Sequence, residues 1–104
     1  MTALGIDIGG THIKWGVWDA AGRELAAAAT PTPTDLPELL DRLEGIIASA
    51  REKQAAATVG IGVPGFIDRR PGKILLSPNL PCLDGFRLGR ELRHRSGLPV
   101  LVEN

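Results

Sequence analysis

Near its start the chain reads Gly5-Ile6-Asp7-Ile8-Gly9-Gly10-Thr11-His12-Ile13-Lys14, in which two apolar runs meet at a glycine pair. The runs 4–8 and 13–18 are short and rich in β-branched and aromatic residues, a composition that favours strands. The segment Gly9-Gly10-Thr11 therefore predicts a tight turn between two strands. Such a turn is either a plain hairpin connection or a place where backbone N–H groups can meet a phosphate.

Length and composition limit the kind of protein that this chain can form. Its 104 residues suffice for one modest domain with one core. Twelve Lys plus Arg balance twelve Asp plus Glu, so no net charge attracts nucleic acid or an anionic membrane. The single Cys82 excludes an internal disulfide framework and fits a reducing compartment. No signal segment or membrane-spanning run is present, and we expect a cytoplasmic domain with neither nucleic-acid nor membrane partners.

Hydrophobic periodicity and the positions of turn-forming glycine and proline residues predict the order β-β-β-α-β-β-α-β for the whole chain. Leucine and isoleucine recur at helical spacing after the proline-rich segment 30–34. The short apolar run 58–63 ends at Pro64-Gly65 and reads as a buried strand. The expected later elements are a strand over 23–30, a helix capped by Thr34 and reaching about Arg51, strands over 58–63 and 73–77, a helix over 86–95 capped by Asp84, and a strand over 100–102.

The residue types of the opening motif suit phosphoryl transfer, which requires positioning and neutralisation of charge. Gly9 and Gly10 let backbone N–H groups approach phosphate oxygens closely, and Thr11 adds a hydroxyl. Asp7 can hold Mg²⁺ directly or through water, while Lys14 supplies positive charge. The Gly-Lys-Ser/Thr pattern of the Walker loop is absent, so any phosphate site here is of a different kind.

Four motifs resemble, in order and spacing, the amino-terminal part of the ROK family, which groups glucokinase-like bacterial sugar kinases with sugar-responsive repressors. They are Asp7-Ile8-Gly9-Gly10-Thr11-His12-Ile13-Lys14, Gly60-Ile61-Gly62-Val63-Pro64-Gly65, Ser77-Pro78-Asn79-Leu80 and Pro99-Val100-Leu101-Val102-Glu103-Asn104. The resemblance covers nearly all of this chain and about the first third of a typical member. It implies an α/β domain of the actin-like ATPase (ribonuclease H-like) fold, with helices packed on a mixed sheet.

The resemblance also implies a set of site residues. Those expected to bind ATP are Asp7, Gly9, Gly10, Thr11, His12 and Lys14, with Asp7 holding Mg²⁺. Those expected to bind a hexose are Gly65, Asn79 and Asn104. Asparagine amides suit sugar hydroxyls because they both donate and accept hydrogen bonds. The alternatives are that Asn79 only forms a turn and that Asn104 belongs to a frayed terminus.

In the family an Asp follows the Glu-Asn pair that here is Glu103-Asn104, and it removes the proton of the sugar 6-hydroxyl as general base. That position lies one residue beyond Asn104. Strand alternation turns Glu103 away from Val102 and Asn104, so we give it a secondary role at most. We expect residues 1–104 to be the amino-terminal domain of an ATP-dependent kinase acting on glucose or an N-acetylated hexosamine, inactive without its carboxy-terminal domain.

Two other functions are compatible with these motifs. One is a non-catalytic sugar-binding or interaction module that has kept the fold without the base. The other is a fragment of a sugar-responsive repressor, a class that carries a helix-turn-helix ahead of the phosphate motif. Whichever function holds, the final strand and the helix ends are expected to face another domain in the complete fold. An isolated domain leaves that apolar surface uncovered, which favours self-association, so a homodimer is one expected assembly.

Overall fold

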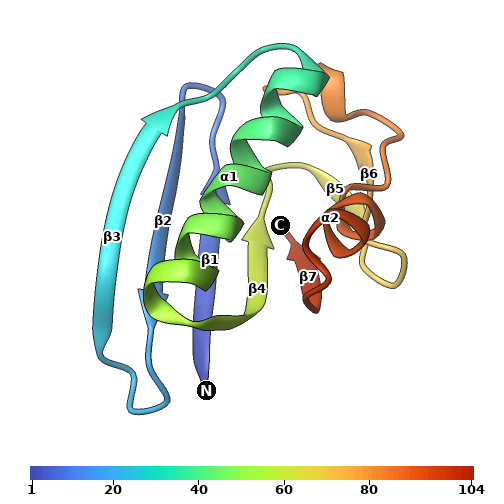
Figure 1. Cartoon of the computed structure of the whole chain (residues 1–104). Helices are drawn as coiled ribbons and strands as arrows, with labels where there is room; N and C mark the ends of the chain where they lie inside the picture. The colour runs from blue at the N-terminus through green and yellow to red at the C-terminus, as the bar shows by residue number, and fades with distance from the viewer.

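The computed structural model describes residues 1–104 as a five-stranded sheet with two α-helices on one face (Figure 1). The strand order is β3-β2-β1-β4-β7. The first three strands, β1 (Thr2–Ile8), β2 (His12–Trp18) and β3 (Glu24–Pro31), form an antiparallel meander, and β4 (Ala56–Gly62) and β7 (Val100–Glu103) run parallel to β1. A separate two-stranded sheet contains β5 (Phe66–Asp68) and β6 (Lys73–Leu76). The expected α/β fold with a mixed sheet is confirmed.

The core lies between the sheet and the helices α1 (Leu36–Gln54) and α2 (Leu88–Ser96). In β1 the apolar residues Leu4, Ile6 and Ile8 are buried, whereas Asp7 between them is exposed. This period-two alternation assigns one face of the sheet to the helices and leaves the other face uncovered. No helix of the chain combines the length and apolar character required to cross a membrane.

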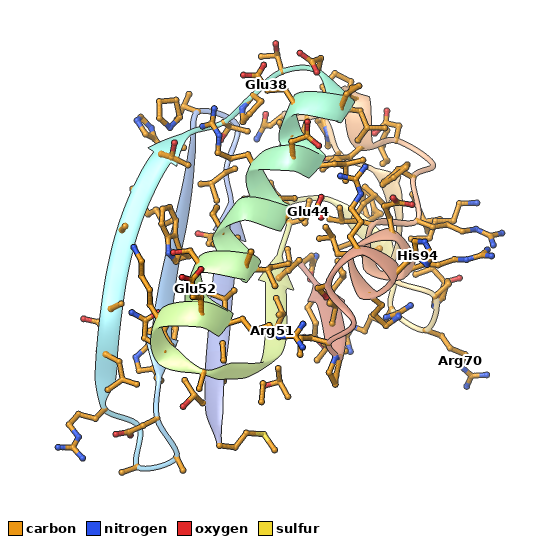
Figure 2. All side chains as sticks on the ribbon, viewed as in Figure 1. Glu38, Glu44, Arg51, Glu52, Arg70 and His94 are labelled. Carbon is orange, nitrogen blue, oxygen red and sulfur yellow. The ribbon has the colours of Figure 1, made fainter.

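Polar side chains also join the two helices. The guanidinium of Arg95 on α2 lies 3.0 Å from Glu44 and 3.2 Å from Asp41 of α1. Arg51, near the end of α1, donates a hydrogen bond of 2.6 Å to the carbonyl of Ser96. Figure 2 shows Glu44 and Arg51 on the same helix, α1, with α2 beside it. These links hold α2 against α1, next to strand β7.

The helix starts differ from the sequence-based expectation. Asp35, rather than Thr34, caps α1, because its carboxylate accepts a 2.8 Å hydrogen bond from the N–H of Glu38. Helix α1 also runs three residues past Arg51, to a left-handed cap at Ala55. Helix α2 begins at Leu88 without a side-chain cap. Patterns of residue type locate a cap only to within a residue or two, since any nearby acceptor can take the free N–H groups.

Two short elements were not predicted. Strand β5 and a 3₁₀ turn, Pro81–Leu83, extend the predicted element order. Phe66 of β5 is largely exposed, so this three-residue strand leaves no pattern of burial in the sequence. Asp84, expected to cap the second helix, instead accepts a 2.7 Å hydrogen bond from the N–H of Ser77. Its carboxylate therefore stabilises the loop after β6 and is not used by α2.

Candidate functional site

Strand pairing places four residues in one row across the uncovered face of the sheet. Asp7 of β1 pairs with Lys14 of β2 on one side and with Gly62 of β4 on the other. Gly62 in turn pairs with Glu103 of β7. Paired residues of neighbouring strands project to the same face. The row therefore presents an ammonium and two carboxylates on the face that no helix covers.

Gly62 is a member of this row that sequence reasoning did not single out. A Cβ at this position would lie 3.7 Å from Oδ1 of Asp7, so the carboxylate reaches across the glycine. Glu103 alternates with buried Val102, as expected. The register adds that Glu103 lies on the face of Asp7, where it pairs with Arg69 at 3.8 Å. Alternation within one strand cannot reveal which residues of another strand lie beside it.

The glycine turn follows β1 at the same edge of the sheet. The N–H of Gly9 donates to the carbonyl of His12 at 2.9 Å and closes the turn. Gly10, Thr11 and His12 are exposed, and Nδ1 of His12 lies 3.3 Å from Oγ1 of Thr11. The N–H groups of Gly10 and Thr11 donate to no other backbone group. Free, exposed N–H groups in a glycine turn suit the binding of an anion.

Asn79 lies against this turn. A Cβ built on Gly10 would come within 3.2 Å of Cβ of Asn79, which is close packing. The loop of Asn79 is itself a turn, closed by a 3.0 Å hydrogen bond from the N–H of Leu80 to the carbonyl of Ser77. Asn79 thus does occupy a turn, as the alternative interpretation requires, but its exposed side chain borders the glycine turn. The structure brings together two motifs that are far apart in the sequence.

Gly65 and Asn104 are joined directly. Nδ2 of Asn104 donates to the carbonyl of Gly65 at 3.0 Å, so the side chain of the last residue has a defined partner. Gly65 has φ of +131°, and a Cβ there would collide with the carbonyl of Leu76. Just before it, the N–H of Val63 donates to the carbonyl of Glu103 at 2.8 Å. The loop after β4 is therefore held by the end of β7 and tolerates only glycine at its bend.

Two buried hydroxyls stabilise these loops, and sequence reasoning missed both. Ser77 is fully buried and donates to the carbonyl of Pro64 at 3.0 Å, which ties the loop of Asn79 to that of Gly65. Thr32 reaches the glycine turn in the same way, with hydrogen bonds to Gly9 and Thr11. Ser77 opens the motif Ser77-Pro78-Asn79-Leu80, but the motif does not indicate this contact, and Thr32 belongs to none of the four motifs. Only the tertiary contacts identify the roles of both residues.

The donor groups at this edge fit magnesium better than a metal held entirely by protein. Asp7 is an exposed carboxylate, and no group of three His, Cys, Asp or Glu side chains is gathered anywhere in the structure. Mg²⁺ commonly uses one or two carboxylates and keeps waters or phosphate oxygens as its other ligands. A hollow of about 400 Å³ adjoins Asp7 and Lys14 on the uncovered face, and its wall includes Trp18.

Comparison with known proteins agrees with this arrangement. The sequence matches the ROK family over residues 3–104. It is 36% identical to the glucokinase of Streptomyces coelicolor over 101 residues, which is 97% of this chain and 32% of that protein. It is 35% identical to the N-acetyl-D-glucosamine kinase of Photobacterium profundum, over 96% of this chain and 33% of the relative.

Among solved structures, a ROK family glucokinase from Streptomyces griseus, in complex with glucose and AMPPNP, superposes with a TM-score of 0.90 at 36% identity. The match covers all of this chain and 33% of that one, so the chain spans about a third of the length of the relatives it matches. The predicted actin-like ATPase fold is the fold of these neighbours and is confirmed. By sequence and by structure, the chain belongs to the ROK family.

Proposed function

We propose that residues 1–104 form the amino-terminal domain of an ATP-dependent sugar kinase that phosphorylates the 6-hydroxyl of glucose or an N-acetylated hexosamine. The observation that carries this proposal is the contact between Gly10 and Asn79. It places a turn suited to phosphate beside an amide suited to a sugar hydroxyl, which is the juxtaposition that phosphoryl transfer requires. The relatives named as glucokinase and N-acetyl-D-glucosamine kinase support the substrate class.

In this proposal the glycine turn and the row beside it bind the phosphates of ATP. The N–H groups of Gly10 and Thr11 donate to phosphate oxygens, and Lys14 offsets their negative charge. Asp7 holds Mg²⁺ through its carboxylate, with His12 at the border of the phosphates. When bound, Mg²⁺ supplies neutralisation of phosphate charge. The AMPPNP bound by the Streptomyces griseus glucokinase supports the use of a nucleotide.

The hexose is proposed to lie beside Asn79 and Asn104. One N–H of the Asn104 amide donates to the carbonyl of Gly65, which leaves its other N–H and its Oδ1 for a sugar hydroxyl. Gly65 contributes mainly by fixing the orientation of Asn104. This is a narrower role than the direct hexose contact that the family resemblance implies for Gly65.

The general base is proposed to lie outside these 104 residues. Glu103 pairs with Arg69 and lies on the sheet face of Asp7, whereas the amide of Asn104 turns to the Gly65 loop. Without a base and without the remaining two thirds of a ROK kinase, the chain should bind ligands weakly and transfer no phosphate. A general base alone contributes about 10²–10⁴-fold to rate.

The proposal can be tested by joining this chain to the carboxy-terminal two thirds of the Streptomyces coelicolor glucokinase. ADP release with ATP, Mg²⁺ and either glucose or N-acetylglucosamine should appear in the chimera and be absent from the 104-residue chain. The variant Asp7→Asn should abolish turnover, whereas Asp68→Asn, an exposed aspartate of β5, should not. A chimera that has the circular dichroism of a folded protein but no sugar-dependent turnover would contradict the kinase proposal.

A further inference from the structure

Thr32, the first residue after β3, is held against the glycine turn by two hydrogen bonds. Its N–H donates to the carbonyl of Thr11 at 2.9 Å, and its hydroxyl donates to the carbonyl of Gly9 at 2.8 Å. Thr32 is only 9% exposed, one of two buried polar residues in the chain. The contact joins residues 23 positions apart in the sequence. Both ends of the turn are therefore bonded to one buried side chain and its backbone.

The planarity of the peptide group gives these bonds a directional consequence. The carbonyl of Gly9 and the N–H of Gly10 belong to one trans peptide unit, so they point in opposite directions. When the Thr32 hydroxyl holds that carbonyl, the N–H of Gly10 is turned away from Thr32. The same reasoning applies to the carbonyl of Thr11, which is held by the N–H of Thr32.

We infer that Thr32 is a positioning residue for phosphate binding, because its hydroxyl fixes the peptide plane that aims the Gly10 N–H at a phosphate oxygen. The inference rests on the proposed function, since it takes the glycine turn as the phosphate site. The N–H of Gly10 donates to no other backbone group and is exposed, so it is available for a ligand. Preorganised N–H donors bind an anion more strongly than donors that must first rotate into place.

The hydroxyl, rather than the backbone, carries the specific part of this role. The N–H bond to Thr11 continues the pairing of β2 with β3 and would form with most residues. The hydroxyl bond needs a serine or threonine at this position. Pro31 and Pro33 flank Thr32 and restrict the backbone on both sides. The Thr32 side chain therefore projects from a segment of restricted conformation.

Thr30 offers a matched control. It lies two residues earlier, within β3, and its hydroxyl accepts a 2.8 Å hydrogen bond from Arg42 rather than donating one to the turn. Thr30→Val, near the end of β3, and Thr32→Val, just after it, make the same chemical change two residues apart. Thr32→Ser keeps the hydroxyl and removes only a methyl group.

The experiment is a titration of the ¹⁵N-labelled chain with Mg²⁺ and inorganic tripolyphosphate, followed through the amide signals of Gly9, Gly10 and Thr11. The wild-type chain should show shifts confined to the turn. Thr32→Val should weaken the apparent affinity about five- to tenfold, the value of roughly one hydrogen bond. Thr32→Ser and Thr30→Val should stay within about twofold of the wild type.

The outcomes separate this inference from the function on which it rests. Equal affinities of Thr32→Val and Thr30→Val, with clear shifts in the wild type, would overturn the role of Thr32 and leave the phosphate turn intact. Absence of shifts at the turn in the wild type would overturn both. Should Thr32→Val fail to fold, the hydroxyl proton of Thr32 in the wild type provides the test. Its exchange with solvent should be slow, and its NMR signal should shift during the titration. Exchange at the rate of a solvent-exposed hydroxyl would contradict the hydrogen bond.

Discussion

Gly10 and Asn79 are in close packing contact, with only 3.2 Å between the Cβ that an alanine would add and Cβ of Asn79. Sixty-eight residues separate them in the chain, yet they lie at one edge of the molecule. The absence of a side chain at position 10 is what allows the two loops to approach. Any larger residue must push the Asn79 loop outward or be displaced itself.

Gly10→Ala should therefore affect both loops at once. We expect the amide and side-chain signals of Asn79 to shift, and the affinity for Mg²⁺-tripolyphosphate to fall about tenfold, or roughly 1.4 kcal/mol. Gly60→Ala is the control, because a Cβ at this exposed strand position meets nothing within 4 Å. Unchanged Asn79 signals in Gly10→Ala would show that the loops are not in contact in solution.

Gly65→Ala should be strongly destabilising. Its φ of +131° is a conformation that residues with a Cβ rarely adopt, and the new Cβ would collide with the carbonyl of Leu76. The backbone strain alone should lower the free energy of unfolding by about 1–3 kcal/mol in urea denaturation.

Gly45→Ala, within α1 and with open space around its Cβ, is the comparison for this glycine. It should raise the free energy of unfolding by about 0.5–1 kcal/mol, because alanine favours helix. Equal effects of the two substitutions would rule out the strained bend at Gly65.

The start of α1 provides a third test. Asp35→Ala should lower the free energy of unfolding by about 1 kcal/mol, because the N–H of Glu38 loses its acceptor. Thr34→Ala, which removes the cap that the sequence pattern favoured, should change it by less than about 0.5 kcal/mol. Urea denaturation of the two variants distinguishes the two candidate caps. A larger loss of free energy of unfolding in Thr34→Ala would show that Thr34 is the cap.

Cys82 should react slowly as a nucleophile. Burial raises the pKa of its thiol above the ordinary value of 9.0, and the charges of Asp35 and Asp84 act in the same direction, against one backbone hydrogen bond that lowers it. Alkylation by iodoacetamide at pH 8, followed by mass spectrometry, should be slower than in a peptide of residues 78–86. A rate equal to that of the peptide would contradict this prediction.

The sign of the stability effect follows from the same shift. The pKa of Cys82 is higher in the folded chain than in the unfolded chain. The neutral thiol's contribution to the free energy of unfolding is therefore complete below the unfolded pKa. It is lost as the pH rises through the folded pKa. Above about pH 9, the free energy of unfolding of the wild type should therefore fall relative to that of Cys82→Ala.

Much of the fold could be predicted because its main elements carry strong local patterns. Leu4, Ile6 and Ile8 alternate with half-buried or exposed residues in β1, and the leucines and isoleucines of α1 recur at helical spacing. Strand β5 could not be predicted, because Phe66 faces solvent and no burial pattern marks it. The helix caps were missed by a residue or more, since competing acceptors such as Asp35 and Asp84 differ only in where the backbone places them.

The amino-acid sequence by itself determined the glycine turn after β1, the family to which the chain belongs and the types of group available for phosphate and sugar. Those depend on local residue types and their spacing. Only the tertiary structure decided that Gly10 meets Asn79, that Glu103 shares the face of Asp7, and that Thr32 holds the turn. Register between strands and contacts between distant loops arise from packing of the whole chain, which no local pattern encodes.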